Sequence, residues 1–358
     1  MRRRSRQITL GGLAVGGNAP ISVQSMCTTD TRDVAATLQQ IAALEQAGCE
    51  IVRCAVPDQE AARALKPIRQ GCRIPLIADI HFDYRLALAA VAAGVDGLRI
   101  NPGNIGERWQ VTEVVRACQE RQIPIRIGVN AGSLEKELLR KHGHSSAAAM
   151  VESALRHIRL LEEEQFNQIK VSLKASDIPR TVAAYRLLAE QVDYPLHIGV
   201  TEAGTSWSGT IKSAIGLGVL LAEGIGDTLR VSLTGDPVTE VRVGWEILKS
   251  LELRQRGPVF ISCPTCGRCR IDLIGIAREV EERLQDLPLP LKIAVMGCAV
   301  NGPGEAREAD LGIAGGNEEG ILFRRGALLR KVPQAKLADA LVKAAWQEVA
   351  TRQGDKKS

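Results

Sequence analysis

Aromatic residues are scarce in this chain: Phe, Trp and Tyr make up 3% of its 358 residues. Proteins that bind single-stranded nucleic acids stack the bases on aromatic side chains, so the scarcity argues against that class. The charge balance does not favour it either, because 46 basic and 41 acidic residues leave a net charge of only +5. We therefore expect no nucleic-acid partner. A net charge this small still leaves room for a local basic pocket aimed at a small anion.

Long apolar runs are also missing. No stretch approaches the ~18 consecutive apolar residues that a membrane-spanning helix needs. The N-terminus, MRRRSRQITLGGLAVGG, is basic and then apolar, but its apolar part is short and interrupted by glycine, unlike that of a signal peptide. We predict a cytoplasmic protein with no membrane partner, and we expect disorder only at the ends, MRRRSR and TRQGDKKS.

The cysteines do not form a disulfide framework. There are nine of them, an odd number scattered over the whole chain, and four lie between residues 263 and 298. Disulfide-rich proteins are short and carry even sets of cysteines, so this pattern favours reduced thiols and a metal cluster.

Short β-rich runs alternate with helical patterns from residue 21 to about residue 253. The runs are 21–26 (ISVQSM), 50–56 (EIVRCAV), 75–80 (PLIADI), 97–101 (GLRIN), 124–130 (PIRIGVN), 168–173 (QIKVSL), 196–200 (LHIGV) and 228–233 (TLRVSL). Eight repeats of strand and helix predict a (β/α)8 TIM-type barrel over residues 1–255, with a doubly wound open sheet as the alternative. The preceding segment ITLGGLAVGG predicts a small hairpin that closes the barrel floor.

Polar residues stand at the C-terminal ends of the predicted strands, which is where barrels of this type carry their chemistry. They are, strand by strand, Gln24 and Ser25; Arg53; Asp79, His81 and Asp83; Arg99, Asn101 and Asn104; Arg126 and Asn130; Ser172 and Lys174; His197 and Glu202; and Arg230 and Ser232. One arginine at such a place is usually a surface residue. Five cations that each interrupt an apolar run, on five strands, need an anionic ligand.

Guanidinium forks match phosphate oxygens, so the strand-end cations predict a pocket for a phosphate or diphosphate ester. The turn INPGNIG (100–106) offers backbone amides to an anion, although ordinary turn chemistry explains its Pro and Gly equally well.

A second domain is predicted over residues 256–358, after a hinge at Gly257 and Pro258. VFISC, LKIAVMG, DLGIAGG and GILFRRG are expected to be strands. GRCRIDLIGIAREVEERLQ and PQAKLADALVKAAWQEVATR are expected to be helices, which would place Cys269 about one turn inside the first of them. This pattern indicates a small α+β unit.

The cysteines of this second domain are spaced like metal ligands. Cys263, Cys266 and Cys269 form a C-x2-C-x2-C run, and Cys298 follows at a predicted strand end. The five histidines all lie at or before His197, so a local Cys3His zinc site is excluded, while a four-cysteine zinc site stays open. The favoured alternative is a [4Fe–4S] cluster with three or four cysteine ligands. Glu305, seven residues after Cys298, is a carboxylate that could bind iron or move protons.

Several long motifs carry a resemblance to a known family. ADIHFDYRLAL, LRINPGNIG, IPIRIGVNAGSLE, VSLKASD, VTEAG, KSAIGLG, LLAEGIGDTLRVSL, CPTCGR and GCAVNGPGEA resemble the 4-hydroxy-3-methylbut-2-enyl diphosphate synthases of the methylerythritol phosphate route to isoprenoids. The resemblance extends from about residue 7 to the last helix, and the chain has the two-domain bacterial length. It implies a barrel, an iron–sulfur domain, and a reductive ring opening of 2-C-methyl-D-erythritol 2,4-cyclodiphosphate with loss of water.

The resemblance also implies the cluster ligands and the partners. One [4Fe–4S] cluster per chain would be held by Cys263, Cys266, Cys298 and Glu305, and Cys269 falls outside the ligand pattern. The electron donor would be flavodoxin or ferredoxin, and the assembly a head-to-tail homodimer. Glu202 is our candidate for the proton donor or for a group that holds the substrate hydroxyl, with a salt bridge to a barrel arginine as its alternative role.

The substrate-binding set that we predict is Arg53, Asp79, His81, Arg99, Asn101, Arg126, Asn130, Ser172, Lys174, His197, Arg230 and Ser232. Two other functions stay open at this stage. A [4Fe–4S] hydro-lyase acting on a phosphorylated substrate would need no external electrons. A zinc or cluster module that binds RNA would leave the strand-end cations unexplained.

Overall fold

The computed structural model describes residues 2–298 and 306–354. The chain divides into two compact units between Arg254 and Gln255, one residue before the boundary drawn from the sequence.

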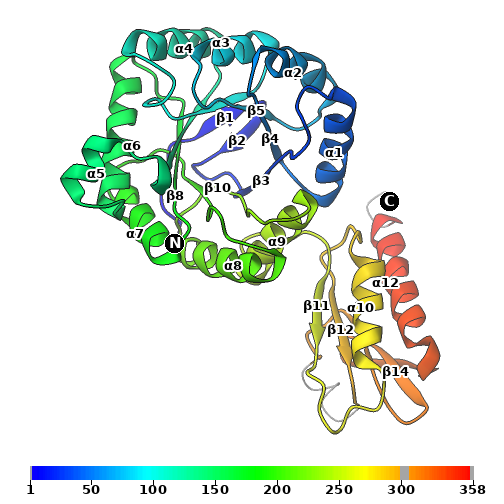
Figure 1. The fold of residues 1–358 in the computed structure, drawn as a ribbon. Coiled ribbons are helices and arrows are strands. Elements are labelled where there is room, and N and C mark those ends of the chain that lie inside the picture. Colours follow the sequence, from blue (N-terminus) through cyan, green and yellow to red (C-terminus); the bar gives the residue numbers. More distant parts are fainter. Residues whose placement is uncertain (1, 299–305, 355–358) are drawn as a thin grey trace. The chain divides into compact units, whose positions relative to one another are not determined.

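The first unit is a ring of eight parallel strands surrounded by helices (Figure 1). The strands are β3 (Ser22–Met26), β4 (Ile51–Ala55), β5 (Leu76–Asp79), β6 (Gly97–Ile100), β7 (Ile125–Asn130), β8 (Ile169–Lys174), β9 (His197–Ile198) and β10 (Thr228–Leu229). Their order is β8-β7-β6-β5-β4-β3-β10-β9, and a parallel bridge between Val171 and Leu196 links β8 to the β9 side. The predicted barrel is confirmed, and the open doubly wound sheet is excluded.

The last two barrel strands are shorter than the sequence pattern suggested, with two residues each. The backbone nevertheless stays hydrogen-bonded past their ends, because Arg230 N donates to Ile198 O at 3.0 Å and Thr201 N donates to Ala175 O at 3.2 Å. The strand-end residues on this side are therefore still held by the barrel wall.

Each barrel strand is followed by helix, and two helices stand between β7 and β8. The helices are α1 (Val34–Ala47), α2 (Gln59–Gly71), α3 (Tyr84–Ala93), α4 (Arg108–Arg121), α5 (Lys136–His142), α6 (Ala147–Glu163), α7 (Ile178–Ala189), α8 (Ser206–Ala222) and α9 (Pro237–Ser250). Asp83, which the sequence offered as a strand-end polar group, caps α3 by accepting from Arg85 N at 2.9 Å. Gly94 ends α3 with φ of 88°, a left-handed conformation that suits glycine.

A hairpin closes the barrel floor, as predicted. Strands β1 (Ile8–Leu10) and β2 (Leu13–Val15) pair antiparallel. Ile8, Leu10 and Val15 pack with Ile51 and Ile77, which come from the barrel strands. Gly97 leaves room for this plug, because a Cβ at that position would lie 2.6 Å from Leu10 Cδ1. The lower half of the barrel interior is therefore partly filled by apolar side chains.

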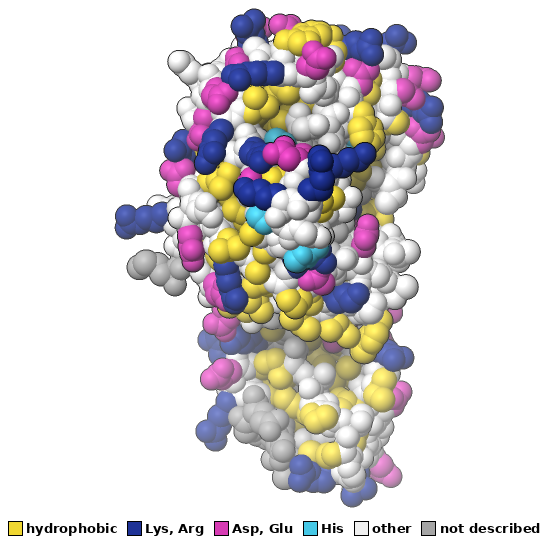
Figure 2. All heavy atoms as spheres, turned by 60° about the vertical axis from the view of Figure 1, so that its left-hand side comes forward, with side chains coloured by type: hydrophobic (Ala, Val, Ile, Leu, Met, Phe, Trp, Pro, Cys, Tyr) yellow, Lys and Arg dark blue, Asp and Glu magenta, His cyan; other side chains and the backbone are white. Residues whose placement is uncertain are grey.

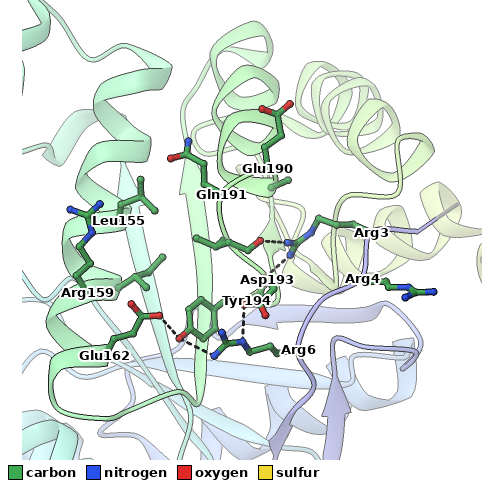
Figure 3. Close-up of a pocket in the computed structure, with 13 residues that line it drawn as sticks. Arg3, Arg4, Arg6, Leu155, Arg159, Glu162, Glu190, Gln191, Asp193 and Tyr194 are labelled. Carbon is green, nitrogen blue, oxygen red and sulfur yellow. Dashed lines mark hydrogen bonds and ion pairs between the residues drawn. The ribbon is translucent and has the colours of Figure 1, made fainter.

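The N-terminal arginines are ordered, so the expected disorder at MRRRSR is wrong for residues 2–6. Arg3 donates to the carbonyls of Val192 and Tyr194 after α7, and Arg6 lies over the Tyr194 ring with its guanidinium carbon 4.6 Å from the ring centroid (Figure 3). Arg2 pairs with the buried Asp227 at 2.6 Å. The basic residues that resembled a leader segment fasten the chain start to the barrel.

The second unit is a five-stranded sheet with two long helices. Its elements are β11 (Val259–Ser262), α10 (Leu273–Leu284), β12 (Lys292–Met296), β13 (Leu311–Ala314), β14 (Glu319–Arg324), β15 (Ala327–Pro333) and α12 (Leu337–Gly354), in the strand order β11-β12-β13-β14-β15. Strand β15 was not predicted, because its residues 327–331 are all exposed and show no alternation of buried and exposed positions.

The first helix of this unit begins later than predicted. Helix α10 starts at Leu273, and its N-cap Asp272 accepts from Gly275 N at 3.0 Å. Cys269 therefore lies in the loop before the helix rather than one turn inside it. Within the described part of the chain, no helix has the length and apolar character needed to cross a membrane.

Replacing Asp227 by Asn should loosen the N-terminal attachment. Asp227 is 2% exposed and accepts from Arg2, from Ser5 Oγ at 3.0 Å and from Leu196 N at 2.8 Å. Because the substitution removes a charged partner from buried donors, we expect Asp227→Asn to lower the free energy of unfolding by about 1.5–3 kcal/mol, measured by urea denaturation.

Asp193→Asn is the matched control. Its pair with Arg6 is 2.7 Å long but lies in solvent, with side chains 55% and 44% exposed. Exposed pairs contribute about 0–1 kcal/mol, so this variant should change little. Equal losses in the two variants would contradict a special role for Asp227.

Candidate active site

A cavity of about 120 Å³ opens where the barrel strands end. It is lined by Arg53, Asp79, His81, Arg99, Arg126, Asn130, Ser172, Lys174, Thr201, Arg230 and Ser232. Ten of the twelve residues predicted to bind substrate are in this set, and these ten come from six barrel strands or the loops that follow them. The structure therefore brings together most of the polar strand-end residues.

The strand register explains why three charged side chains of neighbouring strands meet. Asp79 on β5 pairs with Arg99 on β6, and Arg99 pairs with Arg126 on β7. Residues at matched positions on adjacent strands point to the same side of the sheet, here the barrel interior. Arg126 is 2% exposed, and Arg99 is 7% exposed. These side chains are built into the barrel rather than lying on its surface.

Asp79 holds two of the arginines in place. Its Oδ1 lies 3.1 Å from Arg99 Nη1, and its Oδ2 lies 3.5 Å from Arg53 Nε. Burial disfavours the charged form of Asp79, but the coulombic attraction of Arg53 and Arg99 outweighs it, so that its pKa falls from 3.8 to about 2. The carboxylate is therefore ionised at neutral pH and serves as an internal counter-ion.

Positive charge still exceeds negative charge in this pocket. Burial, followed by the charges of Arg53 and Arg99, lowers the pKa of Arg126 well below its usual value. Burial, followed by Arg230 and Arg126, does the same to the pKa of Lys174. Among the described residues, Nε and Nη1 of Arg126 have no hydrogen-bond partner. Unpartnered buried donors beside other cations are the physical mark of a site that binds an anion.

Two glycines leave the space that these cations occupy. A Cβ at Gly128 on β7 would lie 2.5 Å from Arg99 Nε, and a Cβ at Gly199 would lie 2.7 Å from Lys174 Nζ. Any larger residue would push the cation out of its position. Both glycines are thus part of the pocket, although no pattern in the sequence singled them out.

Three of the predicted site residues do not line the cavity. His197 is 0% exposed, and burial, followed by Arg126 and Lys174, lowers its pKa well below 6.5, which leaves a neutral ring. Asn101 turns back to its own loop, where its Oδ1 accepts from Gly103 N at 3.1 Å. Glu202 is exposed and has a left-handed backbone with φ of 51°.

Two residues of the site were missed. Thr201 lines the cavity three residues after the end of the seventh barrel strand, and its place in the motif VTEAG was available as a signal. Glu240 in α9 is 5% exposed, lies 3.6 Å from Arg230 Nη2 and accepts from Leu233 N at 2.9 Å. It is a second internal counter-ion, and a buried glutamate on the inner face of a helix is not visible without the fold.

The cysteine-bearing segments of the second unit lie against each other. Gly297 N donates to Cys263 Sγ at 3.1 Å, and Arg270 N donates to Gly297 O at 3.1 Å. The loop after β11 therefore adjoins the end of β12, where Cys298 follows. None of the nine cysteines is paired in a disulfide. Cys266 is exposed, and Cys263, Cys269 and Cys298 are partly buried.

The donors fit a thiolate-held metal cluster in kind, since the cysteines are soft thiol ligands carried by two adjoining loops. In the described ranges, no three Cys, His, Asp or Glu side chains are arranged as a finished metal site. Glu305, the fourth predicted ligand, lies outside the described residues. Cys269 differs from the others, because its thiol donates to Ile271 O at 3.3 Å and packs against Gly297.

A larger cavity of about 660 Å³ lies beside the N-terminal segment, but its chemistry is different (Figure 3). Arg3 and Arg6 line it, yet both are already engaged by backbone carbonyls or by Asp193. Over the α5 and α6 side of the barrel, Lys and Arg side chains lie beside Asp and Glu rather than forming one basic surface (Figure 2). Unbalanced, buried positive charge distinguishes the strand-end cavity.

Comparison with known protein families identifies the family of this chain. Residues 5–245 match the GcpE TIM-barrel domain, and residues 259–347 match the GcpE protein C-terminal domain. This chain belongs to the GcpE family. A GcpE-family relative from Geobacter sulfurreducens is 70% identical over 342 residues, covering 96% of this chain and 97% of the relative. A second, from Symbiobacterium thermophilum, is 59% identical over 349 residues, covering 98% and 94%. Both are named 4-hydroxy-3-methylbut-2-en-1-yl diphosphate synthase (flavodoxin).

Two solved structures resemble about 70% of this GcpE-family chain. Dihydropteroate synthase from Xanthomonas albilineans has a TM-score of 0.51 at 16% identity, covering 69% of this chain and 98% of the other. 3-Dehydroquinate dehydratase from Geobacillus kaustophilus has a TM-score of 0.50 at 14% identity, covering 70% and 99%. At such identities the likeness concerns the fold.

Gly128→Ala should disturb the anion pocket without touching a charged residue. Its Cβ would lie 2.5 Å from Arg99 Nε, so Arg99 must move away from Asp79 and from the cavity. Because one charge-assisted contact contributes about 1.5–3 kcal/mol, we expect the affinity for inorganic pyrophosphate, measured by calorimetry, to fall roughly tenfold or more.

Gly132→Ala provides the control. This glycine lies four residues further along the same segment, and no atom lies within 4 Å of the position that its Cβ would take, so pyrophosphate affinity should be unchanged. Unaltered binding in Gly128→Ala would remove Arg99 from the anion site.

Proposed function

We propose that this chain converts 2-C-methyl-D-erythritol 2,4-cyclodiphosphate into 4-hydroxy-3-methylbut-2-en-1-yl diphosphate, using two external electrons and releasing water. It is thus an oxidoreductase of isoprenoid precursor biosynthesis by the methylerythritol phosphate pathway. The observation that carries the proposal is the strand-end cavity of buried cations in a GcpE-family chain that is 70% identical, over nearly its full length, to a relative with that name.

The cavity suits the diphosphate part of this substrate. Arg53, Arg99, Arg126, Lys174 and Arg230 supply charge and directed donors. Asn130, Ser172, Thr201 and Ser232 add neutral hydrogen-bonding groups on the same cavity wall. Asp79 and Glu240 hold arginines by ion pairs, so we assign them a positioning role and not a direct contact with phosphate.

Proton transfer is assigned to groups near the cavity mouth. His81 lines the cavity, its side chain is 50% exposed, and its Nε2 lies 3.9 Å from Asp79 Oδ2. Glu202 follows Thr201 directly and is exposed, so it can meet a substrate hydroxyl only from the rim of the cavity. We retain Glu202 as the candidate acid and place His81 beside the substrate.

The family implies an iron–sulfur cluster, and we propose that it is one [4Fe–4S] cluster per chain. Cys263, Cys266 and Cys298 would hold it, with Glu305 as a replaceable fourth ligand. The adjoining loops around Gly297 support this set, and the hydrogen bond from Cys269 to Ile271 O supports a structural role for Cys269. When bound, the cluster supplies one electron at a time and a Lewis-acidic iron.

We also propose an electron donor and an oligomeric assembly for the protein. The relatives carry flavodoxin in their names, and we propose flavodoxin, with ferredoxin as the alternative donor. We also propose a head-to-tail homodimer in which the cluster unit of one chain serves the barrel of the other. We also place the protein in the cytoplasm, because nine cysteines without a disulfide framework suit a reducing compartment.

The direct test is turnover of the cyclodiphosphate by anaerobically purified protein. Product should form when a chemical reductant is supplied and should not form without it. Loss of water without any reductant, giving a different product at the oxidation level of the cyclodiphosphate, would instead identify a hydro-lyase. Iron and sulfide analysis of the same sample separates a cluster from zinc.

Single substitutions test the ligand set. Cys266→Ser should lose both iron and activity, whereas Cys269→Ser should keep the cluster and most activity, because its thiol is engaged by Ile271 O. Glu305→Gln should keep much of its iron but turn over poorly. Iron and sulfide content read out each variant independently of turnover.

Cys269→Ser is the control for Cys266→Ser, since both remove a thiol from the same loop. Loss of the cluster in Cys269→Ser, together with full activity in Glu305→Gln, would instead favour a cluster held by four cysteines that only transfers electrons.

A further inference from the structure

A second group of polar side chains lies inside the barrel and does not line the strand-end cavity. Gln24 on β3, Lys170 on β8 and His197 on β9 are 1%, 2% and 0% exposed. None of the three is needed to bind a ligand in the cavity above. Their burial is costly unless their polar atoms are satisfied, so they require an explanation of their own.

The strand register shows which barrel residues are the neighbours of each of these side chains. Lys170 pairs directly with Arg126 on the neighbouring strand. On the other side, His197 pairs with Thr228, and Thr228 pairs with Ser22, whose hydroxyl lies 2.9 Å from that of Thr228. Gln24 stands two residues after Ser22, so both point to the same side of β3.

The charges that act on Lys170 and His197 come from the same part of the barrel. Burial, with a further contribution from Arg126, lowers the pKa of Lys170 from 10.5 to about 7, and Asp227 opposes the shift. The lowered pKa of His197 has burial as its largest cause, with Arg126 and Lys170 among the contributing charges. The region thus carries the charge of Arg126, and that of Lys170 when its amine is protonated, beside a neutral imidazole.

The polar atoms of this region have no protein partner. Among the described residues, no hydrogen bond is made by Lys170 Nζ, by either ring nitrogen of His197, by either amide atom of Gln24, or by Nε and Nη1 of Arg126. Each such buried group costs about 1–3 kcal/mol when unsatisfied. Most of these atoms are donors, since the guanidinium and the ammonium only donate and the neutral imidazole donates once. The region therefore needs an acceptor.

The balance of charge in the barrel interior indicates that this acceptor is an anion. The cations are Arg53, Arg99, Arg126, Lys170, Lys174 and Arg230, and their paired carboxylates are Asp79 and Glu240, which leaves an excess of four positive charges when both lysines are protonated. Asp227, whose charge also acts on Lys170, is already paired with Arg2. A cyclic diphosphate would bring only two negative charges to set against this excess. The choice of that ligand rests on the proposed function. Lys170 stands four residues before Lys174, about 13 Å deeper along the strand, so a ligand held at the strand ends does not neutralise it.

We propose that Gln24, Arg126, Lys170 and His197 form an internal binding site for a small inorganic monoanion of the chloride class, beneath the strand-end cavity. The near-complete burial of Gln24, Lys170 and His197 excludes a bulky ligand. An anion beside Lys170 favours the charged ammonium and offsets the repulsion between Lys170 and Arg126. It thereby stabilises the Arg126 side chain that also lines the cavity above.

Bromide is the probe that tests the site. Crystals of the whole protein grown with pyrophosphate and soaked in sodium bromide should give an anomalous peak within hydrogen-bond distance of Lys170 Nζ. In solution, thermal unfolding with pyrophosphate present should shift upward in sodium bromide relative to sodium gluconate of equal ionic strength. Pyrophosphate is included so that halide effects at the upper cavity are suppressed.

Lys170→Met removes the charge at similar volume and should weaken bromide binding, measured from the concentration dependence of the thermal shift, roughly tenfold or more. Gln24→Leu is a second variant that should weaken it without removing a cation. Lys66→Met, at an exposed position of α2, is the control and should respond to bromide like the unmodified protein.

A crystal with no bromide peak at Lys170 would overturn the proposal and leave water as the acceptor. An equal bromide response in Lys170→Met and in the unmodified protein would overturn it as well. Failure of pyrophosphate to bind would instead count against the proposed function, and the bromide peak would still decide the internal site.

Discussion

The ion pairs of Asp79 with Arg53 and Arg99 are the interaction on which the barrel unit depends most. Their distances are 3.5 Å and 3.1 Å, and the carboxylate is 2% exposed. Burying several cations together is unfavourable, because desolvation and mutual repulsion add. One buried carboxylate that contacts two of them lowers this cost and fixes their directions. Glu240 performs the same task for Arg230 on the other side of the barrel. The remaining excess charge is the property that makes the site an anion receptor.

The scaffold must be rigid to hold like charges together. Parallel strands in fixed register prevent Arg99 and Arg126 from separating, and Gly128 and Gly199 give the cations room without letting them swing outward. At the opposite end, the hairpin residues Ile8, Leu10 and Val15 fill the barrel floor with apolar atoms. Repulsion near the strand ends is therefore opposed by close packing below, which protein interiors supply at nearly crystalline density.

Periodicity and charge placement were enough to predict the barrel and most of its cavity, since each cation interrupts an apolar strand in the sequence itself. What was missed depends on three-dimensional neighbours. Glu240 is in a helix, and only the fold shows that it reaches Arg230. Strand β15 has no buried face over residues 327–331, so it carries no alternating signal. The start of α10 was predicted too early. Asp272 caps the helix after an irregular loop, and the residues before and after this cap do not differ enough in helix propensity to reveal the boundary.

The two kinds of buried cation give the barrel interior an adjustable charge. Arginine keeps its proton in nearly every environment, so Arg53, Arg99 and Arg230 provide a constant positive field. Lysine loses its proton more readily than arginine does. Burial, together with nearby guanidinium groups, lowers the pKa of both Lys170 and Lys174. An arriving anion favours the protonated amines, and its departure favours the neutral ones. The barrel can thus reduce its own repulsion when no ligand is bound and restore full attraction when one enters, which reconciles a stable fold with a strongly cationic interior.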